Sequence, residues 1–319
     1  MPFAVERLLG VVKCQRATFG APYRREASSG SVVLVCRAPR GATSAQRESF
    51  RRASMIFVRQ YGSCREKVIV VHGGPGAAGH MARVARALSD CYGVIEPFQR
   101  QSGGERLTVA RHVADLHEVV RLYAGTSRPA LVGASWGAML TLAYAAEHPD
   151  SSGPLVLVGC GIFDPVARAE MQNKIAERMT DDIRAELERA EHLGGDEGLR
   201  ANARAMKGIY SYDPIGCPHQ DGEIDARGHD ETWRDMLRLQ EEGIYPASFS
   251  RITAPVLMVH GAYDPHPGRL IFRSLQPFVP QLEYRELEQC GHYPWLERAA
   301  SDTFFSVVGH WLRRHITSP

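Results

Sequence analysis

A serine flanked by glycines is the part of this sequence whose residue types point most directly to chemistry. Residues 133–137 read Gly-Ala-Ser-Trp-Gly, directly after the apolar run 130–132 and directly before a segment with helical spacing. Such a G-x-S-x-G sequence between a strand and a helix forms a strained turn that exposes the serine hydroxyl at the helix N-terminus. The helix dipole there favours developing negative charge. The sequence therefore predicts Ser135 as a nucleophile, although an ordinary turn serine also satisfies the bare pattern.

A second glycine-rich segment, His-Gly-Gly-Pro-Gly at 72–76, follows the apolar run 67–71. Acyl transfer requires two N–H donors directed at the oxyanion of the tetrahedral intermediate. We expect the backbone amides of Trp136 and Gly74 to be these donors, and Gly73 to contact the substrate. The segment lacks both G-x-G-x-x-G and the P-loop lysine, so dinucleotide or phosphate binding ranks lower.

An aspartate and a histidine follow the serine in the chain order Ser, Asp, His. Asp264 comes shortly after the apolar run 256–259, and His292 comes shortly after the alternating run 282–287. Ligands in open α/β sheets bind at the carboxyl ends of the strands, so both side chains are expected at one edge of the sheet. We predict that His292 takes the Ser135 proton and that Asp264 orients the imidazole. Taken singly, each residue also fits an ordinary loop histidine or a turn-forming Asp-Pro.

Strand and helix patterns alternate through most of the chain, which predicts an α/β fold with a doubly wound, mostly parallel sheet. The core is expected at 55–162 and 249–319. Residues 163–248 interrupt the alternation with charged segments of helical spacing, so we predict an inserted helical cap. Trp233 is expected on the inner apolar face of that cap, in contact with substrate. The predicted strands are 55–61, 67–71, 94–95, 130–132, 155–158, 256–259 and 282–287, and the predicted core helices are 78–90, 107–123, 137–147 and 299–314.

These motifs together resemble the α/β-hydrolase fold superfamily. The resemblance rests on 72–76, 133–137, the Gly-x-x-Asp turn at 261–264 and the Gly-His pair at 291–292. The motifs HGGPG and G-x-S-W-G are similar to those of the proline iminopeptidase branch, peptidase family S33. The resemblance implies a Ser-His-Asp hydrolase that needs neither a metal nor an organic cofactor.

The chain also departs from that branch. Where the branch has Asp-Gln-Arg-Gly-Ser-Gly, residues 96–103 read Glu-Pro-Phe-Gln-Arg-Gln-Ser-Gly, so the leading aspartate is lost. Peptidases of the branch hold the free amino terminus of the substrate with cap carboxylates. Nothing in the sequence selects among the five carboxylates available in the cap, and a solvated charged face explains most of them. These carboxylates are Glu223, Asp225, Glu231, Glu241 and Glu242.

The amino-acid composition further restricts the class of protein. The 319 residues are 44% hydrophobic and 23% charged, as in ordinary globular proteins. Residues 1–54 carry ten basic and three acidic side chains, while the other 265 carry 28 basic and 33 acidic, so the overall charge of +2 averages two different stretches. We predict a basic, poorly ordered extension at 1–54 that a start at Met55 could omit. Seven scattered cysteines without C-x-x-C predict neither disulfides nor a zinc site.

These observations favour a cytoplasmic enzyme that uses no nucleic-acid or membrane partner. The expected function is a serine hydrolase that forms an acyl-enzyme on a small ester, lactone or amide. A proline iminopeptidase that releases N-terminal proline from a short peptide is the first alternative. A ligand receptor that keeps the triad but turns over slowly is the second, because one fold hosts many functions.

Overall fold

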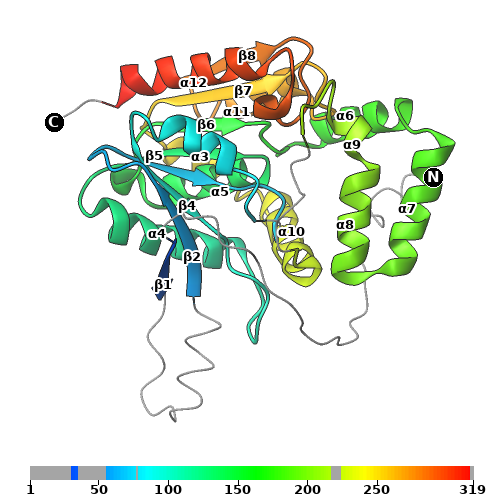
Figure 1. Cartoon of the computed structure of the whole chain (residues 1–319), viewed down its shortest axis with the longest axis horizontal. Coiled ribbons are helices and arrows are strands. Elements are labelled where there is room, and N and C mark those ends of the chain that lie inside the picture. The colour runs from blue at the N-terminus through cyan, green and yellow to red at the C-terminus, as the bar shows by residue number, and fades with distance from the viewer. Residues whose placement is uncertain (1–29, 35–54, 77, 217–223, 317–319) are drawn as a thin grey trace.

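An 8-stranded sheet forms the centre of the protein in the computed structural model, which describes residues 30–34, 55–76, 78–216 and 224–316 (Figure 1). The strand order is β1-β2-β4-β3-β5-β6-β7-β8. Strand β2 pairs antiparallel with both of its neighbours, and the pairs from β4–β3 through β7–β8 are parallel. The strands are β1 (Gly30–Leu34), β2 (Met55–Tyr61), β3 (Lys67–Val71), β4 (Gly93–Pro97), β5 (Ala130–Ala134), β6 (Leu155–Val158), β7 (Val256–Gly261) and β8 (Leu282–Leu287).

The predicted doubly wound, mostly parallel sheet is confirmed. Four strands, β2, β3, β6 and β8, have the predicted bounds. The buried parallel strands are easy to recognise because helices cover both faces, which makes their sequences continuously apolar. Strand β8 lies at the sheet edge, and its partly exposed face explains the alternation in its sequence.

Successive side chains of β3 show how the two faces are filled. Ile69 and Val71 point into one hydrophobic cluster, while Val68 and Val70 point into the other. The first cluster includes side chains of α4 (Val109–Ala124), α5 (Trp136–Glu147) and α11 (Gly268–Leu275). The second includes side chains of α3 (Ala82–Leu88) and α12 (Ser301–His315). The sheet is therefore the middle of three layers.

One strand lies where the sequence predicted a poorly ordered extension. Within 1–54, residues Gly30–Leu34 form β1 and pair antiparallel with residues Met55–Arg59 of β2. Segments 1–29 and 35–54 lie outside the described residues. A chain that starts at Met55 would therefore lose this strand, and the poorly ordered extension at 1–54 stays a prediction. Its short apolar run, Val32–Leu34, was visible in the sequence but lacked a neighbouring pattern that would predict its pairing.

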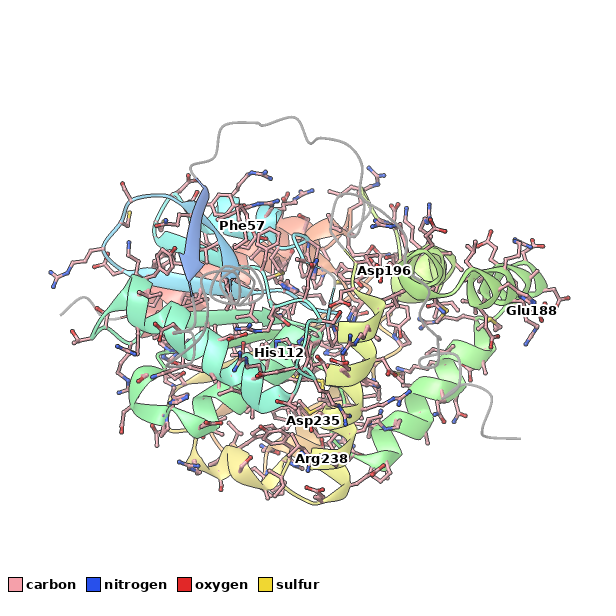
Figure 2. All side chains as sticks on the ribbon, turned by 90° about the horizontal axis from the view of Figure 1, so that it is seen from below. Phe57, His112, Glu188, Asp196, Asp235 and Arg238 are labelled. Carbon is pink, nitrogen blue, oxygen red and sulfur yellow. The ribbon has the colours of Figure 1, made fainter. Side chains whose placement is uncertain are left out.

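Helices occupy the segment between β6 and β7, where the cap was predicted. They are α6 (Pro165–Glu177), α7 (Asp181–Leu193), α8 (Gly195–Ala205), α9 (Lys207–Tyr210) and α10 (Ala226–Glu241). Helices α7 and α8 lie side by side at one end of the molecule, and α10 lies between α8 and the core (Figure 1). Figure 2 shows Asp235 of α10 near His112 of α4; the Asp235 carboxylate accepts the Val109 amide at 2.8 Å. Because α10 bonds directly to a core helix, this part of the cap has a fixed place on the sheet.

Among the residues that the structure describes, no helix has both the length and the apolar character needed to cross a membrane.

Candidate active site

Ser135 occupies the turn between β5 and α5 in a backbone conformation that side chains rarely adopt. Its φ is 54° and its ψ is −122°, and its amide donates to the Val158 carbonyl at 2.8 Å. A Cβ on Gly133 would lie 2.3 Å from the Gly137 carbonyl oxygen, and one on Gly137 would lie 2.2 Å from the Val71 carbonyl oxygen. The two glycines are thus required because the strained turn packs backbone against backbone.

The loop after β3 passes beside this serine. A Cβ on Gly73 would come within 2.9 Å of the Ser135 Cβ, which places Gly73 directly beside the candidate nucleophile. Gly74 has a positive φ of 42°, a conformation that favours glycine. Trp136 is the first residue of α5, so its amide has no acceptor within the helix. The predicted oxyanion donors therefore come from two segments that meet at Ser135.

A glutamine that the sequence interpretation did not select joins these two segments. The Gln99 side-chain amide donates to the His72 carbonyl at 2.7 Å, and its side-chain oxygen accepts the Trp136 indole N–H at 2.7 Å. The Gln99 backbone amide donates to His72 Nε2 at 2.9 Å. Gln99 therefore fixes the loop after β3 relative to the start of α5. Its only signal in the sequence was its place in the Gln-Arg pair of the resembled branch.

Asp264 and His292 meet in a short buried hydrogen bond. His292 Nδ1 lies 2.6 Å from Asp264 Oδ2, and the two side chains are 3% and 0% exposed. The His292 ring packs on Gly159, where a Cβ would lie 3.0 Å from Nδ1. Gly159 directly follows Val158, whose carbonyl accepts the Ser135 amide. The ends of β5, β6, β7 and β8 therefore gather Ser135, Asp264 and His292 around the Val158–Gly159 peptide.

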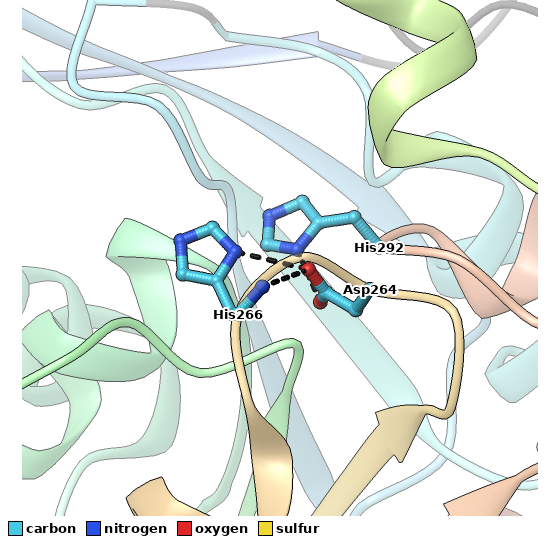
Figure 3. Close-up of side chains that lie close together, drawn as sticks. All are labelled: Asp264, His266 and His292. Atoms are coloured by element: carbon cyan, nitrogen blue, oxygen red, sulfur yellow. Dashed lines mark hydrogen bonds and ion pairs between the residues drawn. The ribbon is translucent and has the colours of Figure 1, made fainter. Parts of the chain in front are cut away.

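Two further histidines contact the Asp264 carboxylate: His266, drawn with Asp264 and His292 in Figure 3, and His260. His266 contacts Oδ1 through its backbone amide and its Nδ1, each at 3.0 Å. His260 Nε2 lies 3.1 Å from Oδ2 and 3.0 Å from the His266 carbonyl. Burial alone would raise the pKa of Asp264, but the charges of His292, His266 and His260 and the hydrogen bond from His260 hold this pKa well below its usual value. The carboxylate is therefore ionised at neutral pH.

The loop that carries His292 is held from the cap. The His292 amide donates to the carbonyl of Tyr210, the last residue of α9, at 2.7 Å. The carboxylate of Glu297, which is 0% exposed, accepts the amides of Gly291, Tyr212 and Asp213 at 3.0, 2.9 and 2.7 Å. Glu297 thus fastens the His292 loop to residues that follow α9. Sequence reasoning missed both Tyr210 and Glu297.

The start of α10 is fastened to the loop after β3 in a comparable way. The Asp225 amide donates to the Gly76 carbonyl at 2.9 Å, and His229 Nδ1 lies 2.9 Å from the Pro75 carbonyl. The Asp225 carboxylate also accepts hydrogen bonds from the amide and hydroxyl of Ser102. The cap therefore contacts both loops: α9 contacts the loop that carries His292, and α10 contacts the loop after β3.

The structure also places two other residues that the sequence analysis discussed, Trp233 and Glu96. Trp233 lies on α10, half-buried against the hydrophobic cluster that contains Trp136, so its contact with substrate stays a prediction. Glu96, in β4, is fully buried and accepts the Tyr61 hydroxyl at 2.7 Å. Burial raises the pKa of Glu96, although Tyr61 and Arg59 oppose the shift. Glu96 therefore belongs to the interior of the sheet.

Asp264, His266 and His292 are also residue types that bind metal ions. One ligand atom from each lies within 4.8 Å of the other two. In this structure the Nδ1 atoms of both histidines face the Asp264 carboxylate as hydrogen-bond donors. The arrangement is explained by these hydrogen bonds, and the expectation of no metal stays a prediction.

Comparison with known proteins agrees with this architecture. A sequence profile described as the Alpha/beta hydrolase family matches residues 68–304, and the chain belongs to that family. It is 23% identical over 305 residues to a proline iminopeptidase of Lactobacillus helveticus, covering 81% of this chain and 94% of the relative. It is 25% identical over 280 residues to a 2-hydroxy-6-oxononadienedioate/2-hydroxy-6-oxononatrienedioate hydrolase of Burkholderia vietnamiensis, covering 81% and 91%. The protein is accordingly a hydrolase, as predicted.

The solved structure of a thermophilic esterase from Thermogutta terrifontis shares the fold. It superposes with a TM-score of 0.62 at 18% identity and covers 91% of this chain and 100% of the esterase.

Proposed function

We propose that this hydrolase uses Ser135 as a nucleophile and His292 as a general base. Asp264 orients the His292 imidazole and stabilises its protonated form. The observation that carries the proposal is the buried 2.6 Å hydrogen bond between His292 Nδ1 and Asp264 Oδ2. The Val158–Gly159 peptide contacts both this pair and Ser135, which is held at φ 54°. The Asp264 carboxylate accepts a hydrogen bond from the Nδ1–H group of His292, so Nε2 is the unprotonated nitrogen of the neutral imidazole.

The proposed reaction proceeds in two steps. His292 Nε2 takes the proton of the Ser135 hydroxyl while the serine oxygen attacks the substrate carbonyl. The amides of Gly74 and Trp136 stabilise the oxyanion, and His292 then gives its proton to the leaving group. Water, activated by the same imidazole, releases the acid from the acyl-enzyme. Asp264 remains ionised throughout because its pKa lies far below neutral pH.

A small ester, lactone or amide is the substrate class that the surroundings favour. Aromatic rings contact His292 on two sides, with ring centroids 5.4 Å away at Tyr210 and 4.9 Å away at Tyr293. Gly73 places no side chain against Ser135, where a Cβ would come within 2.9 Å of the serine Cβ. An uncharged acyl group fits such surroundings because it loses little hydration when it is buried.

A proline iminopeptidase is the second candidate, favoured by the Lactobacillus relative and the HGGPG sequence. Recognition of an N-terminal amine needs an acidic side chain directed at the substrate. Asp225 accepts Ser102, Glu231 accepts the Leu107 amide and pairs with Arg227, and Glu242 pairs with Arg238. Three of the five cap carboxylates are thus already engaged, Glu241 is exposed, and Glu223 lies outside the described residues. Because three of these carboxylates already have partners, we favour an ester over an N-terminal-proline peptide as the substrate.

The test combines covalent labelling with two substrates. We expect a fluorophosphonate probe to label the wild-type protein but not Ser135→Ala, with the exposed Ser306→Ala as a matched control that labels normally. Hydrolysis of p-nitrophenyl butyrate should exceed that of proline p-nitroanilide and should fall by at least about 10³-fold in Ser135→Ala. Unchanged labelling of Ser135→Ala would contradict the nucleophile, and faster anilide cleavage would favour the peptidase. Saturable binding of an ester without turnover would favour a receptor.

A further inference from the structure

The acid of the proposed triad has more hydrogen-bond donors than its base alone requires. Asp264 Oδ2 faces His292 Nδ1 at 2.6 Å and His260 Nε2 at 3.1 Å. Oδ1 faces the His266 amide and His266 Nδ1, both at 3.0 Å. An ionised carboxylate offers about four lone-pair positions. These four donors therefore occupy the whole accepting capacity of Asp264.

The sharing of the Asp264 carboxylate among four donors affects the basicity of His292. Each donor that stabilises the charged carboxylate reduces the negative charge available to the others. The charge of Asp264 stabilises the protonated form of His292, so donors that compete for this charge make His292 less basic. The acid therefore acts on its base through the balance of all four donors, not through one isolated pair.

The position and the protonation state of His266 allow it to compete with His292 for the charge of the Asp264 carboxylate. Its ring stacks on the His292 ring with centroids 4.7 Å apart and planes 21° apart (Figure 3). Burial lowers the pKa of His266, against the opposing effect of Asp264. The imidazole is thus neutral at neutral pH, and its Nδ1 must carry the proton because a carboxylate only accepts. His266 donates a hydrogen bond without adding a full positive charge beside His292.

We propose that His266 is a positioning residue that tunes the basicity of His292 by sharing the Asp264 carboxylate. The proposal rests on the proposed function, because it assumes that His292 is the base. It goes beyond that function because it assigns the pH range of activity to a fourth side chain. With His266 present, the acid limb of the pH profile lies at lower pH than it would with Asp264 and His292 alone.

Other groups near the pair come from several elements, and the comparison must keep them constant. They face the site from β7, from the end of α9, from β8 and from the His292 loop. These groups are His260, Tyr210, Tyr284, Glu286, Cys290 and Glu297. A substitution confined to His266 leaves all of them in place.

Two substitutions separate hydrogen bonding from ring packing. His266→Phe keeps a flat ring against His292 but removes the Nδ1 donor, while His266→Asn loses the ring but keeps a side-chain N–H at a similar position. The pH dependence of kcat/KM for p-nitrophenyl butyrate reports the pKa of the free-enzyme base. We expect the midpoint of the acid limb to rise by about 0.5–1 unit in His266→Phe and to stay within about 0.3 unit of wild type in His266→Asn.

The opposite order would overturn the proposal. A role in packing alone predicts that His266→Phe behaves like wild type, and that His266→Asn loses activity at every pH without moving the midpoint. If His266→Phe fails to fold, NMR titration of the His292 ring in wild type, His266→Asn and His266→Ala gives the comparison: a higher His292 pKa in His266→Ala alone, which lacks the donor, supports the proposal, and equal values in all three contradict it. Failure of the proposed function is recognised separately, because probe labelling in Ser135→Ala would then persist.

Discussion

The two sides of the proposed active site are held in place by different interactions. The nucleophile side, made by the loop after β3 and the turn before α5, depends on backbone packed against backbone at Gly73, Gly133 and Gly137. The acid–base side, made by the loops after β7 and β8, depends on buried carboxylates, Asp264 and Glu297, each surrounded by hydrogen-bond donors. The first is fixed mainly by steric exclusion and the second mainly by charge-assisted hydrogen bonds.

This difference predicts which substitutions would disrupt each side. Backbone packing tolerates no added atoms, because the neighbouring peptide cannot move without disturbing the strand that carries it. A buried carboxylate tolerates shape-conserving changes but not the loss of its charge, because several amides would then lose their acceptor. One side should therefore fail on addition of a methyl group, and the other on neutralisation of a charge.

The largest effect is expected on the nucleophile side from Gly137→Ala. The new Cβ would lie 2.2 Å from the Val71 carbonyl oxygen and 2.5 Å from that of His72. We expect a loss of about 3 kcal/mol or more in the free energy of unfolding, measured by urea denaturation, together with loss of esterase activity. Gly208→Ala is the matched control, since no atom lies within 4 Å of its added Cβ. Equal stabilities of the two variants would show that steric exclusion does not fix this side.

A smaller effect is expected on the acid–base side from Glu297→Gln. The amide group would direct its own N–H toward at least one of the backbone amides that the carboxylate accepts. We expect a loss of about 2 kcal/mol in the free energy of unfolding and a lower kcat, because the His292 loop loses its attachment to the residues after α9. The exposed Glu288→Gln should match wild type in both. An unchanged kcat would show that Glu297 does not position His292.

The smallest effect is expected from a chain that starts at Met55, which lies on neither side of the site. The truncation removes β1 from the edge of the sheet but leaves every contact of Ser135, Asp264 and His292 described above. We expect a folded protein with a lower melting temperature and near wild-type kcat/KM, measured by thermal unfolding and ester hydrolysis. Loss of activity in a folded truncation would show that the N-terminal segment contributes to the site.

Much of the nucleophile side and of the sheet was predictable from the sequence. Parallel strands buried on both faces appear as apolar runs, and glycines forced by tight turns appear as motifs such as the one at 133–137. Asp264 and His292 were predictable because each follows its own strand, and the strand ends meet at one edge. The order of these residues along the chain therefore contained their place in the fold.

Only the tertiary structure decided which side chains support these residues. His266 stacks on His292, Glu297 bonds to residues after α9, and Gln99 bridges His72 and Trp136. None of these contacts has a fixed sequence spacing, because each joins loops whose separation depends on how the cap and the sheet pack. Local backbone geometry is set by neighbouring residues and is visible in the sequence. The sharing of a buried charge among distant donors arises only when the chain has folded.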